Sequence, residues 1–156
     1  MTTGLTGGCQ CGQVRYRAAG TDNAVLCHCR MCQRAMGGPF GWMVSTVDLA
    51  IEGTPSWFQS SSAAKRGFCA ACGTPLFFRL EGGEKTWVTA GSLEDPMLAP
   101  PLEHYGTESR YAWTELASEL PGSPTVPGGI TGDTADVTSF QYITEHAADQ
   151  TAKEAP

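Results

Sequence analysis

The chain has 156 residues, with 10 basic and 16 acidic side chains and a formal net charge of −6. This acidic balance argues against nucleic acid, whose phosphates need a basic face, and against an anionic membrane surface. No apolar run approaches the ~20 residues that a membrane helix needs. The start, MTTGLTGG, lacks the basic and apolar regions of a secretory signal. We therefore expect one globular domain in the cytoplasm.

Short β-strands are predicted along most of the chain, because apolar and polar residues alternate between turn signals. The alternation is clear at Val14, Tyr16 and Ala18. A strand is also expected to end at Cys27. The other predicted strands, in chain order, are 40–44, 47–52, 56–59, 75–80, 86–90 and 102–105. These short strands predict a mainly β, antiparallel fold of the sandwich or barrel type.

Two further local signals lie between the predicted strands. Glu81-Gly82-Gly83-Glu84 separates two apolar runs and predicts a hairpin turn. Arg30 to Met36 predicts a short helical turn, which Gly37-Gly38-Pro39 would end.

The last part of the chain differs in composition. From Gly122 to Pro156 it is rich in Gly, Pro, Thr and Ala, and it contributes −4 of the net charge of −6. Such a segment is typical of a weakly ordered extension. Its short apolar stretch, Phe140 to Ile143, could still dock on the body.

The seven cysteines carry the clearest chemical signal. Seven is an odd number, and thiols stay reduced in the cytosol, so clustered cysteines at short spacing indicate metal binding. A structural zinc takes four ligands, whereas a catalytic zinc takes three protein ligands and keeps one position open. Seven cysteines therefore match one closed site and one open site.

The closed site is expected to join two similar turns. Cys9 and Cys11 form one pair, Cys69 and Cys72 form another, and a glycine follows both Cys11 and Cys72. Glycine allows a positive φ, so that backbone N–H groups can point at the thiolate sulfurs. We expect these four cysteines to hold a structural zinc whose binding energy is largely folding energy.

The open site is expected at the central cysteines. Cys27 ends a predicted strand, and Cys29 and Cys32 stand three residues apart at the start of the predicted helix. A helix N-terminus favours the thiolate form. Arg30 and Arg34 lie beside these cysteines, where guanidinium groups would balance the surplus negative charge of a three-thiolate zinc.

Plainer interpretations stay open at this point. The cysteine pairs could be redox-active or core residues, and Lys65 and Arg66 could be solvated charges. His28 could complete the central site as a fourth ligand, although neighbours of ligands rarely reach the same metal, so we expect an outer-shell or surface role. His104 is expected to be an ordinary, satisfied histidine.

Four segments together resemble one family. GGCQCGQVRY, LCHCRMCQRAMG, FCAACGTPLFF and VTAGSLEDP are similar, in order and spacing, to the glutathione-dependent formaldehyde-activating enzyme (GFA) family. The resemblance implies a zinc-stapled, mostly β architecture of several small sheets with two zinc ions per chain. It assigns Cys9, Cys11, Cys69 and Cys72 to the structural zinc, and the central three to the second zinc. It also implies a GFA-like domain over 1–121 and an extension over 122–156.

The resemblance implies a carbon–sulfur lyase that forms or cleaves S-(hydroxymethyl)glutathione. A three-thiolate zinc suits this chemistry, because it binds another soft thiolate better than it activates water. The partners would be an aldehyde and glutathione or a similar small thiol. Arg30, Arg34 and Arg66 are the candidates for binding the thiol's carboxylates. A homodimer is one option for the assembly. The alternative is a non-catalytic, zinc-stabilised binding module with two structural zinc ions.

Overall fold

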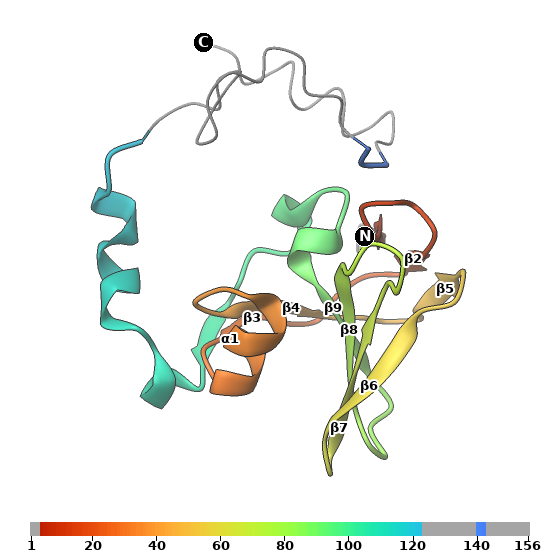
Figure 1. Ribbon diagram of the computed structural model, residues 1–156, viewed down its shortest axis with the longest axis horizontal. Coiled ribbons are helices and arrows are strands. Elements are labelled where there is room, and N and C mark those ends of the chain that lie inside the picture. The colour runs from red at the N-terminus through yellow and green to blue at the C-terminus, as the bar shows by residue number, and fades with distance from the viewer. Residues whose placement is uncertain (1–3, 123–139, 143–156) are drawn as a thin grey trace.

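The computed structural model describes residues 4–122 and 140–142, and within them the fold is mainly β, as predicted (Figure 1). Ten strands form two sheets. The smaller sheet has the order β1 (Leu5–Gly8), β2 (Arg15–Ala18), β5 (Ala50–Glu52). The larger sheet has the order β10 (Glu103–Tyr105), β3 (Ala24–Cys27), β4 (Gly41–Ser45), β9 (Thr86–Thr89), β8 (Pro75–Leu80), β7 (Ala64–Phe68), β6 (Ser56–Ser61).

Neighbouring strands are antiparallel, with one exception at the edge of the larger sheet. There β10 runs parallel to β3, with Tyr105 opposite Cys27. The segment before β10 crosses over through two short 3₁₀ helices, η1 (Ala90–Ser92) and η2 (Pro96–Leu98), so the chain returns in the parallel direction. The predicted hairpin at 81–84 does connect β8 to β9.

The strand predictions differ from the structure where local signals are weak. β1 has the sequence LTGG and β7 the sequence AKRGF, so neither shows regular alternation, and neither was predicted. The predicted strand 47–52 is shorter, because Asp48 adopts a φ of 50°, which interrupts extended backbone. Only Ala50–Glu52 pairs as a strand.

The one α-helix among the described residues, α1 (Arg30–Met36), matches its prediction. Cys29 is its N-cap, and the Cys29 sulfur accepts a hydrogen bond from the Cys32 N–H. Gly37 ends the helix with a φ of 66°, in the left-handed region that glycine tolerates.

The main core packs the two sheets together. Tyr16 of β2 and Phe77 of β8 are both buried, and their rings meet edge to face with centroids 5.6 Å apart. The Tyr16 hydroxyl lies 2.7 Å from the Ser92 hydroxyl, so its polar end is satisfied. A smaller cluster of Val25, Cys27, Cys32 and Met43 lies under α1.

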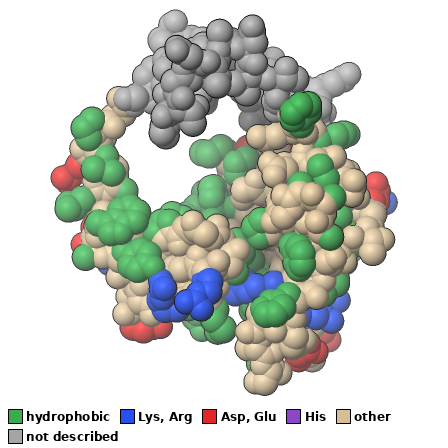
Figure 2. Space-filling view, in the orientation of Figure 1, with side chains coloured by type: hydrophobic (Ala, Val, Ile, Leu, Met, Phe, Trp, Pro, Cys, Tyr) green, Lys and Arg blue, Asp and Glu red, His purple; other side chains and the backbone are tan. Residues whose placement is uncertain are grey.

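After β10 the chain leaves the sheets. It forms η3 (Thr107–Ser109) and η4 (Ala112–Glu119), and η4 buries none of its residues and lies apart from the β body in Figure 1 and Figure 2. In the expected docking segment, the Tyr142 N–H donates to the Gln10 carbonyl at 2.6 Å. The rest of the extension lies outside the described residues. Within the described part of the chain, no helix has the length and apolar character to cross a membrane.

Candidate functional site

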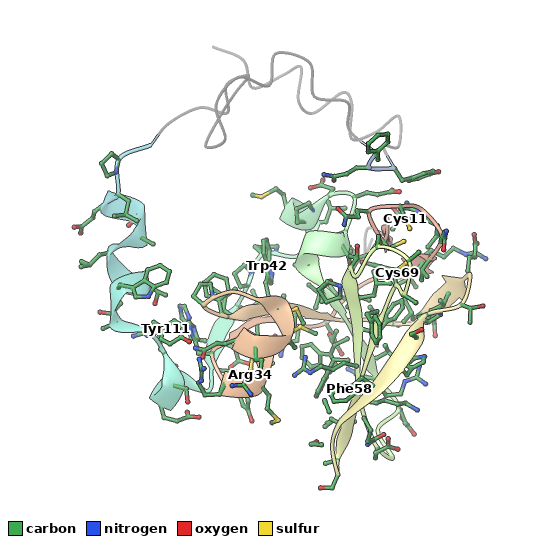
Figure 3. The ribbon with its side chains drawn as sticks, in the orientation of Figure 1. Cys11, Arg34, Trp42, Phe58, Cys69 and Tyr111 are labelled. Atoms are coloured by element: carbon green, nitrogen blue, oxygen red, sulfur yellow. The ribbon has the colours of Figure 1, made fainter. Side chains whose placement is uncertain are left out.

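Four cysteine sulfurs meet between two turns, one after β1 and one after β7. Cys9 and Cys11 come from the first turn, and Cys69 and Cys72 come from the second. Figure 3 shows Cys11 and Cys69 together at this end of the molecule. All four sulfurs lie within 4.8 Å of one another, with Cys9 to Cys11 at 3.5 Å and Cys11 to Cys69 at 3.7 Å. Sulfurs on a tetrahedral zinc would be about 3.8 Å apart, so the set could hold this metal.

The two turns have the backbone geometry that the sequence predicts. Gly12 and Gly73 have φ values of 80° and 76°. The Val14 N–H donates to the Cys9 sulfur at 3.3 Å. Burial opposes ionisation of Cys9, but hydrogen bonds from the Val14 backbone and from neighbouring thiols outweigh it and lower the pKa of Cys9. The turns therefore prepare at least one sulfur as a thiolate ligand.

The central cysteines form a second cluster at the start of α1. Cys27 ends β3, Cys29 caps the helix, and Cys32 lies in its first turn. The sulfurs of Cys27 and Cys29 are 3.4 Å apart, and all three lie within 4.8 Å of one another. Within residues 4–122 and 140–142, no fourth His, Cys, Asp or Glu ligand atom joins this set. The cluster thus offers a metal three thiols and no further protein ligand from these residues.

Arg66 of β7 contacts this second cluster directly. Its Nη2 donates to the Cys32 sulfur at 3.3 Å, and its guanidinium lies 4.9 Å above the Phe78 ring. Its Nη1 is buried without a hydrogen-bond partner among the described residues. A hydrogen bond from Cys27, followed by the Arg66 hydrogen bond and charge, lowers the pKa of Cys32 to about 5 despite burial. Arg66 therefore favours a thiolate here and keeps one donor unused.

The three sulfurs border a cavity of about 510 Å³, a size typical of small-molecule sites. Its wall combines side chains from β3, β4, β6, β7, β8, β9 and β10 with the start of α1. Besides the three cysteines it is lined by Asn23, Val25, Met31, Met43, Ser60, Ser61, Ala63, Ala64, Arg66, Phe78, Leu80, Trp87, Glu103 and Tyr105. The second cluster is therefore open to a ligand.

Comparison with protein families places most of the described chain in one family. The model of a family described as glutathione-dependent formaldehyde-activating enzyme matches residues 4–109. The chain belongs to the GFA family. A Halomonas elongata protein that carries the family's name is 26% identical over 129 residues, which cover 73% of this chain and 82% of that protein. A crystal structure of a Rhodobacter sphaeroides protein is 24% identical with a TM-score of 0.49, covering 64% of this chain and 98% of that one.

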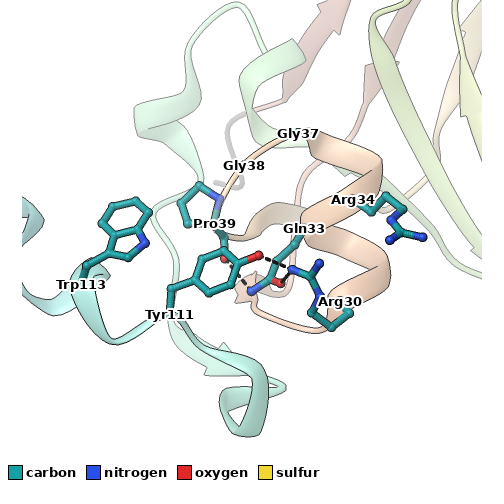
Figure 4. Close-up of a pocket in the computed structure, with 8 residues that line it drawn as sticks. All are labelled: Arg30, Gln33, Arg34, Gly37, Gly38, Pro39, Tyr111 and Trp113. Atoms are coloured by element: carbon teal, nitrogen blue, oxygen red, sulfur yellow. Dashed lines mark hydrogen bonds between the residues drawn. The ribbon is translucent and has the colours of Figure 1, made fainter.

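Arg30 and Arg34 do not line the cavity beside the three central cysteines. Positions 30, 33, 34 and 37 share one face of α1, and they line a different hollow of about 400 Å³. Figure 4 shows the Arg30 guanidinium between Gln33 and the Tyr111 hydroxyl, with Arg34 pointing away from that ring. Arg30 donates to Gln33 at 2.6 Å and to the Tyr111 hydroxyl. Of the three predicted carboxylate-binding arginines, only Arg66 lines the cavity of the cysteine cluster.

His28 lies between two cysteines in the chain and is 1% exposed, so of the two expected roles the surface one is wrong and the outer-shell one stays a prediction. Its Nε2 lies 2.9 Å from Nδ1 of His104, which is therefore satisfied as expected. Its Nδ1 has no partner among the described residues, and its ring meets Phe40 edge to face. Burial lowers the pKa of His28. The ring does not join the cysteine cluster as a fourth ligand.

Met43 and Phe78 were not predicted from the sequence as wall residues, whereas Trp87 was expected in the core or a pocket wall. Met43, Phe78 and Trp87 line the cavity from three neighbouring strands. The sequence places each on a predicted strand but says nothing of the strand order 4-9-8, which brings them together. Gln33 was also missed as a structural residue. It is buried, and its Nε2 donates to the Ser109 carbonyl at 2.9 Å, which ties α1 to the segment after β10.

Proposed function

We propose that the protein is a zinc-dependent carbon–sulfur lyase or synthase. It would form or cleave a thiol–aldehyde adduct such as S-(hydroxymethyl)glutathione, in line with the GFA family name. The observation that carries the proposal is the contrast between the two clusters. Four sulfurs form a complete set at one, whereas three sulfurs border a cavity at the other.

Both cysteine sets suit zinc in their donor chemistry and spacing. Thiolates are soft ligands that favour zinc, and the sulfur separations of 3.4–3.7 Å approach those of a tetrahedral site. We assign Cys9, Cys11, Cys69 and Cys72 to a structural zinc. Cys27, Cys29 and Cys32 would hold a second zinc. Zinc bound by three thiolates supplies a soft Lewis acid that stabilises a further thiol as its thiolate.

The chain's own residues would bind and shield the reactants. Arg66 lines the cavity and would bind a carboxylate of the thiol, and the apolar side chains of Met43 and Trp87 would shield the reactants from water. In the addition, the thiol sulfur forms a C–S bond to the aldehyde carbon and the thiol proton ends on the carbonyl oxygen. In the reverse reaction that bond breaks and the proton returns to sulfur. Arg30 and Arg34 could act only on a group outside the cavity.

The test measures adduct exchange and metal together. Exchange spectroscopy with ¹³C-formaldehyde and glutathione gives the rate of adduct formation above the uncatalysed reaction, and elemental analysis gives zinc per chain. We expect acceleration, two zinc ions in the wild type, and one zinc ion with no acceleration in Cys29→Ser. Met97→Ala, a change at an exposed side chain outside the cavity, is the matched control. A protein with two zinc ions and no acceleration would instead be a zinc-stabilised binding module.

A further inference from the structure

The cavity beside the central cysteines has few charges for a site of its size. Apart from the three cysteines, only Arg66 and Glu103 among its lining side chains carry a charge at neutral pH. Arg66 donates Nη2 to Cys32 and is the one cation among the residues that line the cavity. Glutathione carries two carboxylates and one ammonium. Its second carboxylate would find no cation in this wall, because Arg30 and Arg34 line the other hollow.

Most of the remaining wall is apolar. Val25 and Met43 are buried, and Phe78 and Trp87 are half-buried. At the mouth, Met31 is 55% exposed and Leu80 is 49% exposed, although both are large apolar side chains. Large exposed apolar side chains grouped at one opening mark a surface that a ligand can cover. The wall therefore gains from contact with an apolar group and loses from contact with an unpaired charge.

We infer that the thiol accepted by this cavity has an apolar body and a single carboxylate, which the Arg66 guanidinium binds. The inference rests on the proposed thiol chemistry and narrows its substrate class. The apolar body would lie against Met43, Phe78 and Trp87, with Met31 at the mouth. A charged body such as that of glutathione would leave a carboxylate desolvated or displaced into solvent, and would bind more weakly.

Calorimetric titration of the zinc-loaded full chain tests this with three probes. 2-Mercapto-3-phenylpropanoate has a thiol, an aromatic body and one carboxylate. Glutathione has the thiol with a charged body, and 2-hydroxy-3-phenylpropanoate has the aromatic body without the thiol. We expect the aromatic thiol to bind at least tenfold more tightly than glutathione and than the hydroxy acid. Tryptophan fluorescence provides a second readout, because Trp87 lies in the wall.

The outcomes separate the two proposals. Equal or tighter binding of glutathione would overturn the inferred substrate class and leave the thiol chemistry standing. Equal binding of the hydroxy acid, or no binding of either thiol, would overturn the proposed function and the inference with it.

Two variants, each with a control, test where the aromatic thiol binds. Met31→Glu adds a negative charge at the mouth, and its exposure makes the change tolerable for folding. We expect it to weaken the aromatic thiol at least fivefold, whereas Met97→Glu, elsewhere on the surface, leaves binding unchanged. Arg66→Gln should remove the preference for 2-mercapto-3-phenylpropanoate over its amide, in which the carboxylate is replaced by a neutral group. Arg34→Gln, at an arginine that lines the other hollow, is the control. Unchanged affinity in both Met31→Glu and Arg66→Gln would refute this placement.

Discussion

Serine replacements at Cys72 and at Cys29 should have very different effects on folding. The four-cysteine cluster joins turns that are far apart in the chain, since Cys11 and Cys69 are separated by 58 positions. The three-cysteine cluster is local, since Cys29 and Cys32 are three positions apart. A metal in the first cluster closes a long loop, whereas one in the second constrains only a helix start.

The difference in loop length sets how much more each metal site contributes to the unfolding free energy. A separation of 58 positions is roughly four doublings longer than one of 3. Each doubling of loop length changes the closure free energy by about 0.6 kcal/mol, so a metal that closes the long loop should add about 2.5 kcal/mol more to the unfolding free energy. The binding free energy of a structural zinc adds to this, because the unfolded chain has no preformed site. Cys72→Ser should therefore unfold or aggregate, while Cys29→Ser stays folded.

Guanidinium denaturation, followed by circular dichroism with zinc content measured on the same samples, checks this. We expect Cys29→Ser to lose one zinc and to keep a cooperative transition. Cys72→Ser should lose at least about 2 kcal/mol more of its unfolding free energy, or give no soluble native protein. A Cys72→Ser protein with wild-type denaturation, or a Cys29→Ser protein that unfolds equally, would refute the division into structural and open sites.

Three further changes test other parts of the structure. Gly53→Ala should lower the unfolding free energy by at least about 2 kcal/mol, because a Cβ there would lie 2.1 Å from the Gln13 carbonyl oxygen at a φ of 83°. Hydrogen bonds from Lys85 and Ser45 lower the pKa of Asp22. In Asp22→Asn, the unfolding free energy should therefore fall less steeply than in the wild type as the pH drops below about 4. Deleting 123–156 should leave zinc content unchanged and lower stability by about 1 kcal/mol, because the Tyr142 contact with Arg15 is lost.

Each of these has a control or a contrary outcome. Gly91→Ala introduces a Cβ with no atom within 4 Å, so thermal melting should stay near wild type, and equal losses in both glycine variants would contradict the clash. A carboxyl group such as that of Asp22, whose pKa is lower in the folded state, stabilises the fold at pH values above its pKa in the unfolded state. This stabilisation is lost as the pH falls through the folded-state pKa. An unchanged pH profile in Asp22→Asn would show that this carboxylate contributes nothing. Loss of zinc on truncation would make the extension part of the metal site.

Local signals made the cysteine clusters and α1 predictable. A cysteine pair followed by glycine specifies a turn, and the residues 30–36 with glycine at 37 specify one short helix. β1 and β7 were not predictable in the same way, because a strand such as LTGG is held by its partners rather than by its own alternation. The parallel β3–β10 pair depends on a crossover that no local pattern encodes. The cytoplasmic location, the homodimer and the boundary at 121 stay predictions.

The candidate site was predictable at its ligands and less so at its walls. Arg30, Arg34 and Arg66 looked equivalent as cations near cysteines in the sequence. Helical spacing explains the difference for the first two: positions 30 and 34 lie on the face opposite the capping cysteine cluster, and Arg30 is held by Gln33 and Tyr111. Arg66 reaches the cluster from β7, which three strands of the larger sheet separate from β3, and no local sequence pattern predicts that approach.

The two cysteine clusters are connected through β7 and β8. Cys69 and Cys72 lie in the turn between these strands, β7 carries Arg66 three residues before Cys69, and β8 carries Phe78. Fixing this turn against the loop after β1 also fixes the two strands whose side chains form one wall of the cavity. The four-cysteine cluster therefore bears on ligand binding indirectly. Arg66 lies within hydrogen-bond distance of Cys32, so we expect a metal in the four-cysteine cluster to fix the position of this charge beside the three-cysteine cluster.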